Sequence, residues 1–140
     1  MRRISDFDQP HPGGVDERFH ILDTSSVGRV LYWQSFFQTI RNVPGAIVEC
    51  GVGRGRSLLI ISALNALYDQ AEGGQRDIWA FDSFAGFDEP LPEDDSWRKP
   101  QKGEWSSSPS GAYQYSPEFI QQVLTAARAD SSAPRLVKGY

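Results

Sequence analysis

Two short apolar segments, each carrying an acidic residue at its end, enclose a glycine-rich turn and an apolar run. The first segment, 46–50, contains Glu49, and the second, 78–82, ends in Asp82. Between them lie the glycine turn 51–55 and a long apolar stretch. A strand, a glycine turn, a helix and a second strand in this order predict a parallel βαβ unit. The carboxyl ends of the strands face the ligand crevice in open α/β sheets, so both acids are expected there.

The rest of the chain supplies an arm, two further helices and a third strand. Residues 1–23 are polar and rich in Pro, Gly and Asp, and they predict an amino-terminal arm in which both histidines are surface residues. A helix is expected to begin at the hydroxyl cluster 24–26, to end before Pro44 and to cover one face of the sheet. Ser116 is the expected N-cap of another helix, and 135–138 is the expected third strand.

Three parallel strands joined by crossovers predict an α/β protein with a Rossmann-like, three-layer αβα architecture that stops after the third strand. The first strand normally lies at the centre of such a sheet, yet here its far edge has no partner in the sequence. Residues 24–140 are therefore interpreted as the amino-terminal half of a larger domain, with 83–115 as a lid-like loop. Cys50 is expected to point into the core as a small hydrophobe.

Composition excludes several kinds of partner. A net charge of −4 and the lack of a basic stripe argue against nucleic acid. No apolar run approaches the roughly 20 residues that span a bilayer, and no signal peptide follows the basic start, so no membrane association is expected. The single cysteine excludes an internal disulfide and favours a reducing compartment. A cytoplasmic protein is predicted.

Three kinds of ligand site use a glycine turn of this kind, and the residues here distinguish between them. A dinucleotide fingerprint needs a third glycine where Arg56 stands, which disfavours a nicotinamide-dependent oxidoreductase. A Walker A loop ends in G-K-[ST], and Gly55-Arg56-Ser57 does not match it. The pattern present is acid-x-G-x-G-x-G with a second acid at Asp82, and this arrangement suits S-adenosylmethionine.

Each part of that ligand has an expected partner. Gly51 and Gly53 allow the backbone to approach it closely. The amino end of the following helix, with Ser57 nearby, offers donors and a positive dipole end to a carboxylate. Glu49 is expected to counter the ammonium group and Asp82 to accept hydrogen bonds from the ribose hydroxyls. Apolar contact with the adenine is expected from aromatic residues of the next loop, Phe84 and Phe87.

Three sequence blocks carry a family resemblance. The segment 44–52, the Arg-x-x-Ser of 54–57 and the segment 79–87 together resemble the macrocin O-methyltransferase (TylF-type) family. The resemblance implies methylation of a hydroxyl on a sugar or other natural product, with S-adenosylmethionine and a divalent metal such as Mg²⁺. It implies cofactor contacts from Glu49, Gly51, Val52, Gly53, Ser57, Asp82, Ser83, Phe84 and Gly86.

Two departures from the family pattern are visible. The family usually has tryptophan where Gly53 stands and glycine where Arg56 stands. The family's metal-binding aspartates and catalytic residues lie beyond the third strand, so no metal ligand and no catalytic residue is assigned in this chain.

The sequence therefore predicts the cofactor-binding half of an O-methyltransferase acting on a small-molecule hydroxyl. Either a homo-oligomer or a missing carboxyl-terminal half would cover the open sheet edge. The alternatives are a non-catalytic remnant that binds cofactor or a partner, and the less favoured oxidoreductase.

Overall fold

A computed structural model describes residues 23–72, 76–107, 111, 114–127 and 133–139. The expected amino-terminal arm, including His11 and His20, lies outside the described residues apart from Asp23. The elements in chain order are α1 (Thr24–Ile40), β1 (Ile47–Cys50), α2 (Arg56–Glu72), β2 (Ile78–Asp82), a short 3-10 helix η3 (Pro92–Asp94), α3 (Pro117–Ala126) and β3 (Arg135–Lys138).

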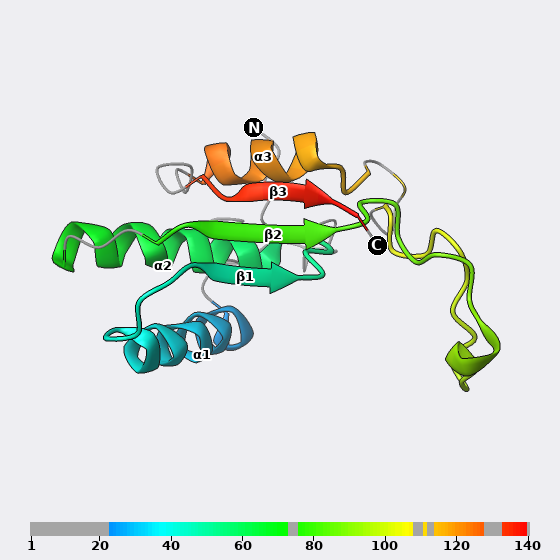
Figure 1. The fold of residues 1–140 in the computed structure, drawn as a ribbon, viewed down its shortest axis with the longest axis horizontal. Coiled ribbons are helices and arrows are strands. Elements are labelled where there is room, and N and C mark those ends of the chain that lie inside the picture. The colour runs from blue at the N-terminus through cyan, green and yellow to red at the C-terminus, as the bar shows by residue number, and fades with distance from the viewer. Residues whose placement is uncertain (1–22, 73–75, 108–110, 112–113, 128–132, 140) are drawn as a thin grey trace, which may run out of the picture.

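The strands form one parallel sheet in the order β1-β2-β3 (Figure 1). Ile47 is aligned with Ile78, and Asp82 at the end of β2 is aligned with Lys138 on β3. All three predicted strands are confirmed, and β1 lies at an edge with no strand on its far side among the described residues. The sheet therefore places the carboxyl ends of β1 and β2 next to each other.

One hydrophobic core joins the three helices to one face of the sheet. Alternating strand residues such as Ile78 and Ala80 pack with Leu58 of α2, Phe37 of α1 and Ile120 of α3. Because the helices share this core, the described part of the chain has two layers, a sheet and a helical layer (Figure 1). This arrangement is the amino-terminal part of a Rossmann-like αβα fold, in which helices cover both faces of the sheet.

Helix α1 differs from the expectation in its start and in its packing. Asp23 is the N-cap, because its side chain accepts a hydrogen bond from the Ser26 N–H at 2.6 Å, so the hydroxyl cluster lies inside the helix. Phe37 is the only fully buried residue of α1, and its ring stacks on Tyr68 of α2 at 5.3 Å. Helix α1 therefore packs against α2, and most of its expected apolar stripe is exposed. No helix of the described residues is both long and apolar enough to cross a membrane.

The prediction that Cys50 points into the core is wrong. Its neighbour Glu49 lies on the face that the helices cover, and strand side chains alternate, so Cys50 points to the opposite face. That face carries no helix among the described residues, and the Cys50 side chain is exposed. The error came from Glu49: an acid is expected to face solvent, which would turn its neighbour Cys50 inward, yet here Glu49 lies on the covered face and accepts a hydrogen bond from Ser57 of α2.

A buried amide fixes the amino end of the sheet. Asn65 of α2 donates to the Arg76 carbonyl at 2.8 Å and accepts from the Arg76 N–H at 3.2 Å. The Arg76 guanidinium then donates to the carbonyls of Ile40 at 2.7 Å and Gly45 at 3.0 Å. The loops that precede β1 and β2 are therefore held together, at the end of the sheet away from Glu49 and Asp82.

Helix α3 begins as the sequence predicts. The Ser116 hydroxyl accepts the Phe119 N–H at 3.2 Å, and Pro117 occupies the first turn. We expect Ser116→Ala to lower the free energy of unfolding by about 1 kcal/mol, because one backbone donor of the first turn loses its acceptor. Denaturant unfolding measures the change. Thr125→Ala, an exposed substitution on the same helix, is the control and should stay within about 0.5 kcal/mol of the parent.

Candidate functional site

The carboxyl ends of β1 and β2 bring the glycine turn and Asp82 into contact. The Asp82 carboxylate accepts the Gly53 N–H at 2.8 Å through Oδ2 and the Phe84 N–H at 2.7 Å through Oδ1. The Gly51 N–H donates to the Phe81 carbonyl at 2.8 Å. Asp82 therefore joins the turn after β1 to the loop after β2, as expected from two neighbouring parallel strands.

The glycines of the turn have two different surroundings. Gly51, Gly53 and Gly55 all have positive φ angles, of +87°, +51° and +75°, which favour glycine. Among the described residues, a Cβ at Gly51 or Gly53 would meet nothing within 4 Å, so this part of the chain leaves open space beside the backbone there. A Cβ at Gly55 would lie 2.7 Å from Cδ1 of Ile120. Gly51 and Gly53 thus leave room for a ligand, whereas Gly55 allows α2 and α3 to pack closely.

Only one of the two carboxylate oxygens of Glu49 accepts a hydrogen bond from the described residues. The Ser57 hydroxyl at the start of α2 donates to Glu49 Oε1, whereas Oε2 is buried and has no hydrogen-bond partner among the described residues. Burial raises the pKa of the Glu49 carboxyl above its usual value; the Ser57 bond opposes this effect and the charge of Asp82 adds to it. An acid in this state is suited to a cationic partner that completes its hydrogen bonds.

The loop after β2 is built around Ser83. Its hydroxyl donates to the Gly86 carbonyl at 2.7 Å and accepts the Ala85 N–H at 3.2 Å. Phe84 has a φ angle of +51°, and its side chain packs against the core described above. The loop is therefore fixed beside Asp82 by its own hydrogen bonds.

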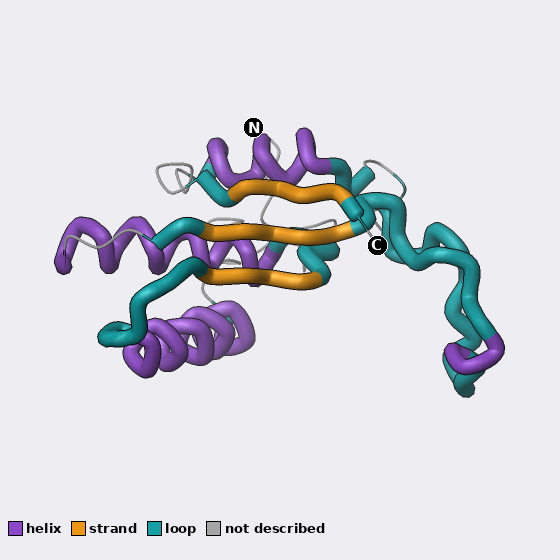
Figure 2. Tube along the Cα trace, viewed as in Figure 1, coloured by secondary structure: helices purple, strands orange, loops and turns teal. Residues whose placement is uncertain are grey.

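Residues 83–107 form a long arm that leaves the carboxyl end of the sheet, and η3 lies near its tip (Figure 2). The two halves of the arm meet at its base. The Gly103 N–H donates to the Phe87 carbonyl at 2.8 Å, and the Phe87 N–H donates to the Glu104 carbonyl at 3.2 Å. Gly86 lies so close to this pair that a Cβ there would be 2.4 Å from the Glu104 carbonyl oxygen. The lid-like loop of the sequence prediction is thus an ordered projection in its described part.

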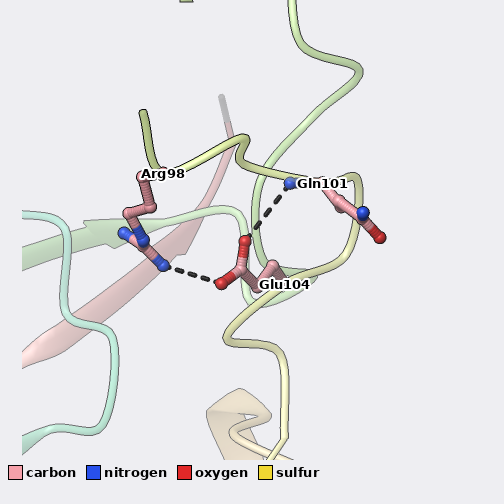
Figure 3. A network of polar contacts seen from close by, with 3 residues as sticks. All are labelled: Arg98, Gln101 and Glu104. Atoms are coloured by element: carbon pink, nitrogen blue, oxygen red, sulfur yellow. Dashed lines mark hydrogen bonds and ion pairs between the residues drawn. The ribbon is translucent and has the colours of Figure 1, made fainter. Parts of the chain in front are cut away.

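An aromatic and charged cluster continues the base of the arm. The Phe87 and Trp105 rings lie 5.1 Å apart, and the Arg98 guanidinium lies over the Trp105 ring at 4.2 Å. Arg98 also pairs with Glu104 at 2.7 Å, and the other Glu104 oxygen accepts the Gln101 N–H (Figure 3). Phe87 therefore packs within the arm, and its expected contact with an adenine stays a prediction.

Charged residues near the turn include two half-buried arginines, Arg54 and Arg56. Burial lowers the pKa of Arg56, and the positive charges of Arg29 and Arg54 add to the effect. The acids Asp94 and Asp95 are exposed on the arm, as expected of a solvated acidic loop. Within the described ranges, no group of three or more His, Cys, Asp or Glu residues is placed to hold a metal ion.

Residues 29–126 match the macrocin O-methyltransferase (TylF) family. The chain belongs to this family. The match covers the glycine turn, both strand-end acids and the arm, so the resemblance noted from the sequence blocks is confirmed. No curated protein sequence matches the chain significantly.

Two solved structures share the fold. The chain is similar to the calicheamicin methyltransferase CalS11, with 24% identity and a TM-score of 0.68 over 98% of this chain and 55% of that chain. The apo structure of CalS11, described as a TDP-rhamnose 3'-O-methyltransferase, is also 24% identical, with a TM-score of 0.55 over 98% of this chain and 53% of that chain. The chain therefore spans about half the length of the solved chains that it matches.

Besides Gly51, Gly53, Ser83 and Phe84, described above, the expected site residues fall into three groups. Glu49, Ser57 and Asp82 carry side chains at the carboxyl end of the sheet, in the places expected from the strand ends. Val52 is buried in the core, so it offers the site only its backbone. Gly86 contacts the base of the arm. Sequence reasoning missed the packing role of Gly55 and the closure of the arm at Gly103, because both depend on contacts with distant segments.

Proposed function

We propose that the chain is the cofactor-binding half of an S-adenosylmethionine-dependent O-methyltransferase. The observation that carries the proposal is Glu49 Oε2, a buried carboxylate oxygen without a hydrogen-bond partner among the described residues, on the strand that leads directly into the turn of Gly51 and Gly53. A ligand without a hydrogen-bond donor would leave this oxygen unsatisfied, whereas an ammonium group would both donate to it and balance the carboxylate's charge. The donor set thus fits the amino-acid end of S-adenosylmethionine.

The remaining groups fit the other parts of the same ligand. The amino end of α2 follows the turn, and its positive dipole end favours a carboxylate. Asp82 already accepts two N–H groups, but each carboxylate oxygen has a second lone pair for a ribose hydroxyl. Ser83 and Phe84 hold the adjoining loop, which would form the wall beside the nucleoside.

The reaction proposed is transfer of a methyl group to a hydroxyl oxygen of a sugar or related natural product. S-adenosylmethionine, when bound, supplies an electrophilic methyl group on a sulfonium. This chain's residues would bind and orient it, which lowers the barrier by positioning. The acceptor class is supported by family membership and by the sugar named for CalS11. The described residues do not fit a Mg²⁺ site, so no step is assigned to a metal.

We further propose that catalytic and metal-binding groups come from a carboxyl-terminal half of the kind that completes the CalS11 chain and covers the β1 edge. Two features support this division: the chain covers 55% of CalS11, and the described sheet ends at β1. We also infer a cytoplasmic location, because the exposed thiol of Cys50 fits a reducing compartment.

Calorimetric titration with S-adenosylhomocysteine tests the proposal. The chain should bind it, and Glu49→Gln should weaken binding about 10-fold, because the ammonium loses a charged partner while the side-chain shape is kept. Glu93→Gln removes the same charge from an exposed position on the arm and should leave the affinity unchanged. A folded chain that binds NADH but not S-adenosylhomocysteine would contradict the proposal and favour the oxidoreductase.

The pH dependence of stability gives Glu49→Gln a second readout. A folded-state pKa raised above the unfolded value means that the folded chain holds the Glu49 proton more tightly. Glu49 therefore costs stability as pH rises from the ordinary glutamate pKa through the raised one. The melting temperature of Glu49→Gln should exceed that of the parent at neutral pH, and the difference should disappear in acid. A variant that is less stable at neutral pH would show that Glu49 mainly holds the fold.

A further inference from the structure

Trp105, at the base of the arm, combines a strained backbone with an exposed ring. Its φ angle of +71° lies in the left-handed region, which bulky residues seldom adopt. The side chain is 54% exposed, although its chain neighbours Glu104 and Ser106 are both half-buried. Burial of the indole therefore does not explain its conformation. Strained residues of this kind cluster at ligand sites, where the surrounding structure holds them in place.

Backbone hydrogen bonds hold the residues on both sides of Trp105. On one side, the Glu104 carbonyl accepts the Phe87 N–H at 3.2 Å, at the closed base of the arm. On the other side, the Ser106 carbonyl accepts the N–H of the buried Tyr115 at 2.9 Å. Two separate segments thus maintain the left-handed conformation, and the fold itself fixes the position of the indole.

One face of the indole is not covered by the aromatic and charged cluster. The Arg98 guanidinium lies over the ring at 4.2 Å, and Glu104 holds that guanidinium through the ion pair at 2.7 Å (Figure 3). Arg98 is also 5.6 Å from the Phe87 ring, which lies 5.1 Å from the Trp105 ring. Because the three groups are mutually close, Arg98 and Phe87 lie on the same side of the indole. Neither covers the opposite face, so a flat ring can stack there.

The position of Trp105 in the fold indicates which ring that is. A Cβ at Gly86 would lie 2.4 Å from the carbonyl oxygen of Glu104, so Trp105 follows a residue that contacts the loop after β2. The same loop is bonded through the Phe84 N–H to Asp82, the acid proposed to hold the ribose. We propose that Trp105 is a cofactor-binding residue whose indole stacks on the adenine of S-adenosylmethionine. This inference rests on the proposed function, and it adds the arm to the cofactor site.

The adenine fits this platform better than the acceptor does. In S-adenosylmethionine the base and the sulfonium are attached at opposite ends of the ribose. With the ribose at Asp82 and the amino-acid end at Glu49, the base extends away from Glu49, toward the loop 83–86 and the base of the arm. The acceptor hydroxyl must instead reach the methyl group on the sulfonium. Stacking on an indole also suits a purine, because it uses the π face of the base and needs no hydrogen bond.

Calorimetric titration with S-adenosylhomocysteine tests the assignment. Trp105→Ala should lower the affinity about 10-fold, because the stacking contact is lost. Trp105→Phe keeps a smaller aromatic platform and should lose less than about 3-fold. Trp97→Ala removes a 94% exposed tryptophan from the same arm and should leave the affinity unchanged. Trp105→Gly separates binding from folding: glycine favours the left-handed conformation, so this variant should melt at a higher temperature than Trp105→Ala yet bind as weakly.

Adenosine, which has the base and the ribose but no amino-acid end, identifies the stacked group. Trp105→Ala should weaken adenosine and S-adenosylhomocysteine by the same factor, whereas Glu49→Gln should weaken S-adenosylhomocysteine alone. Normal binding of both ligands by a folded Trp105→Ala chain would overturn this inference and leave the proposed function standing. Weaker binding of S-adenosylhomocysteine with unchanged binding of adenosine would also overturn it, because the base would then not be the contact. A parent chain that binds neither ligand would contradict the proposed function and this inference together.

Discussion

Replacing Asp82 with alanine is expected to reduce the affinity for S-adenosylhomocysteine at least 100-fold, or by about 2.7 kcal/mol. The carboxylate would accept hydrogen bonds from the ribose, and it also holds the walls of the site. Gly53 and Phe84, whose N–H groups it accepts, both have φ angles of +51°. Hydrogen bonds to a charged group contribute about 1.5–3 kcal/mol each, so losing both should lower the free energy of unfolding by about 3–6 kcal/mol. Calorimetric titration and denaturant unfolding measure the two effects.

Two further variants separate binding from folding at this position. Asp82→Asn keeps the shape but turns an NH₂ group toward one of the two backbone donors, so it should lose about 10-fold in affinity and less stability than alanine does. Asp77→Ala removes the same charge just before the other end of β2, where Asp77 pairs with Arg135 at 4.0 Å. Its affinity should stay within about 2-fold of the parent, because Asp77 lies at the end of β2 away from the site. Its stability should also change little, because surface ion pairs contribute little to the free energy of folding. Normal binding by a folded Asp82→Ala chain would exclude Asp82 from the site.

The strand ends could be predicted from sequence because they depend on local order alone. Glycines between two apolar strands make a βαβ unit the simplest solution, and the unit fixes where Glu49 and Asp82 lie. The cap at Ser116 is equally local, since a serine followed by Pro117 and by an acid in the first turn is a common helix start. These predictions needed no knowledge of the tertiary contacts.

The directions of side chains could not be predicted where packing decides them. Cys50 was assigned to the core as a small hydrophobe beside an acid, yet only the position of the helices decides which face is covered. The same limit applies to α1, where several apolar residues have helical spacing but Phe37 alone is fully buried. An apolar residue that a larger domain would bury carries the same sequence pattern as one buried here.

The closed base of the arm was also out of reach of sequence analysis. A segment rich in Pro and Gly predicts a loop. The conformation of this loop is fixed by hydrogen bonds between residues far apart along it, such as the bond from the Gly103 N–H to the Phe87 carbonyl. The closeness of Gly86 to Glu104 gives that glycine a structural reason to be there. Its part in the family block 79–87 therefore need not come from cofactor contact.

Replacing Gly86 with alanine is expected to lower the free energy of unfolding by about 2–5 kcal/mol. A left-handed conformation costs a side-chain-bearing residue about 1–2 kcal/mol, and Gly86 has a φ angle of +79°. The new Cβ would also lie 2.4 Å from the Glu104 carbonyl oxygen and 2.7 Å from the Gly103 carbonyl carbon. These are backbone atoms that cannot rotate away, so overpacking adds about 1–3 kcal/mol. Denaturant unfolding measures the sum.

Gly111→Ala is the matched control for the cost of placing a side chain on a left-handed backbone. Gly111 has a φ angle of +69°, but a Cβ there would meet no described residue within 4 Å, so the substitution should cost only about 1–2 kcal/mol. The two variants also differ in the arm itself. In Gly86→Ala the contact between Phe87 and Gly103 must open, and trypsin should cleave after Arg98 or Lys102 faster than in the parent. Equal losses of stability in the two variants, with equal cleavage rates, would mean that the arm's base moves aside freely. The closed base would then contribute nothing to the position of the loop beside Asp82.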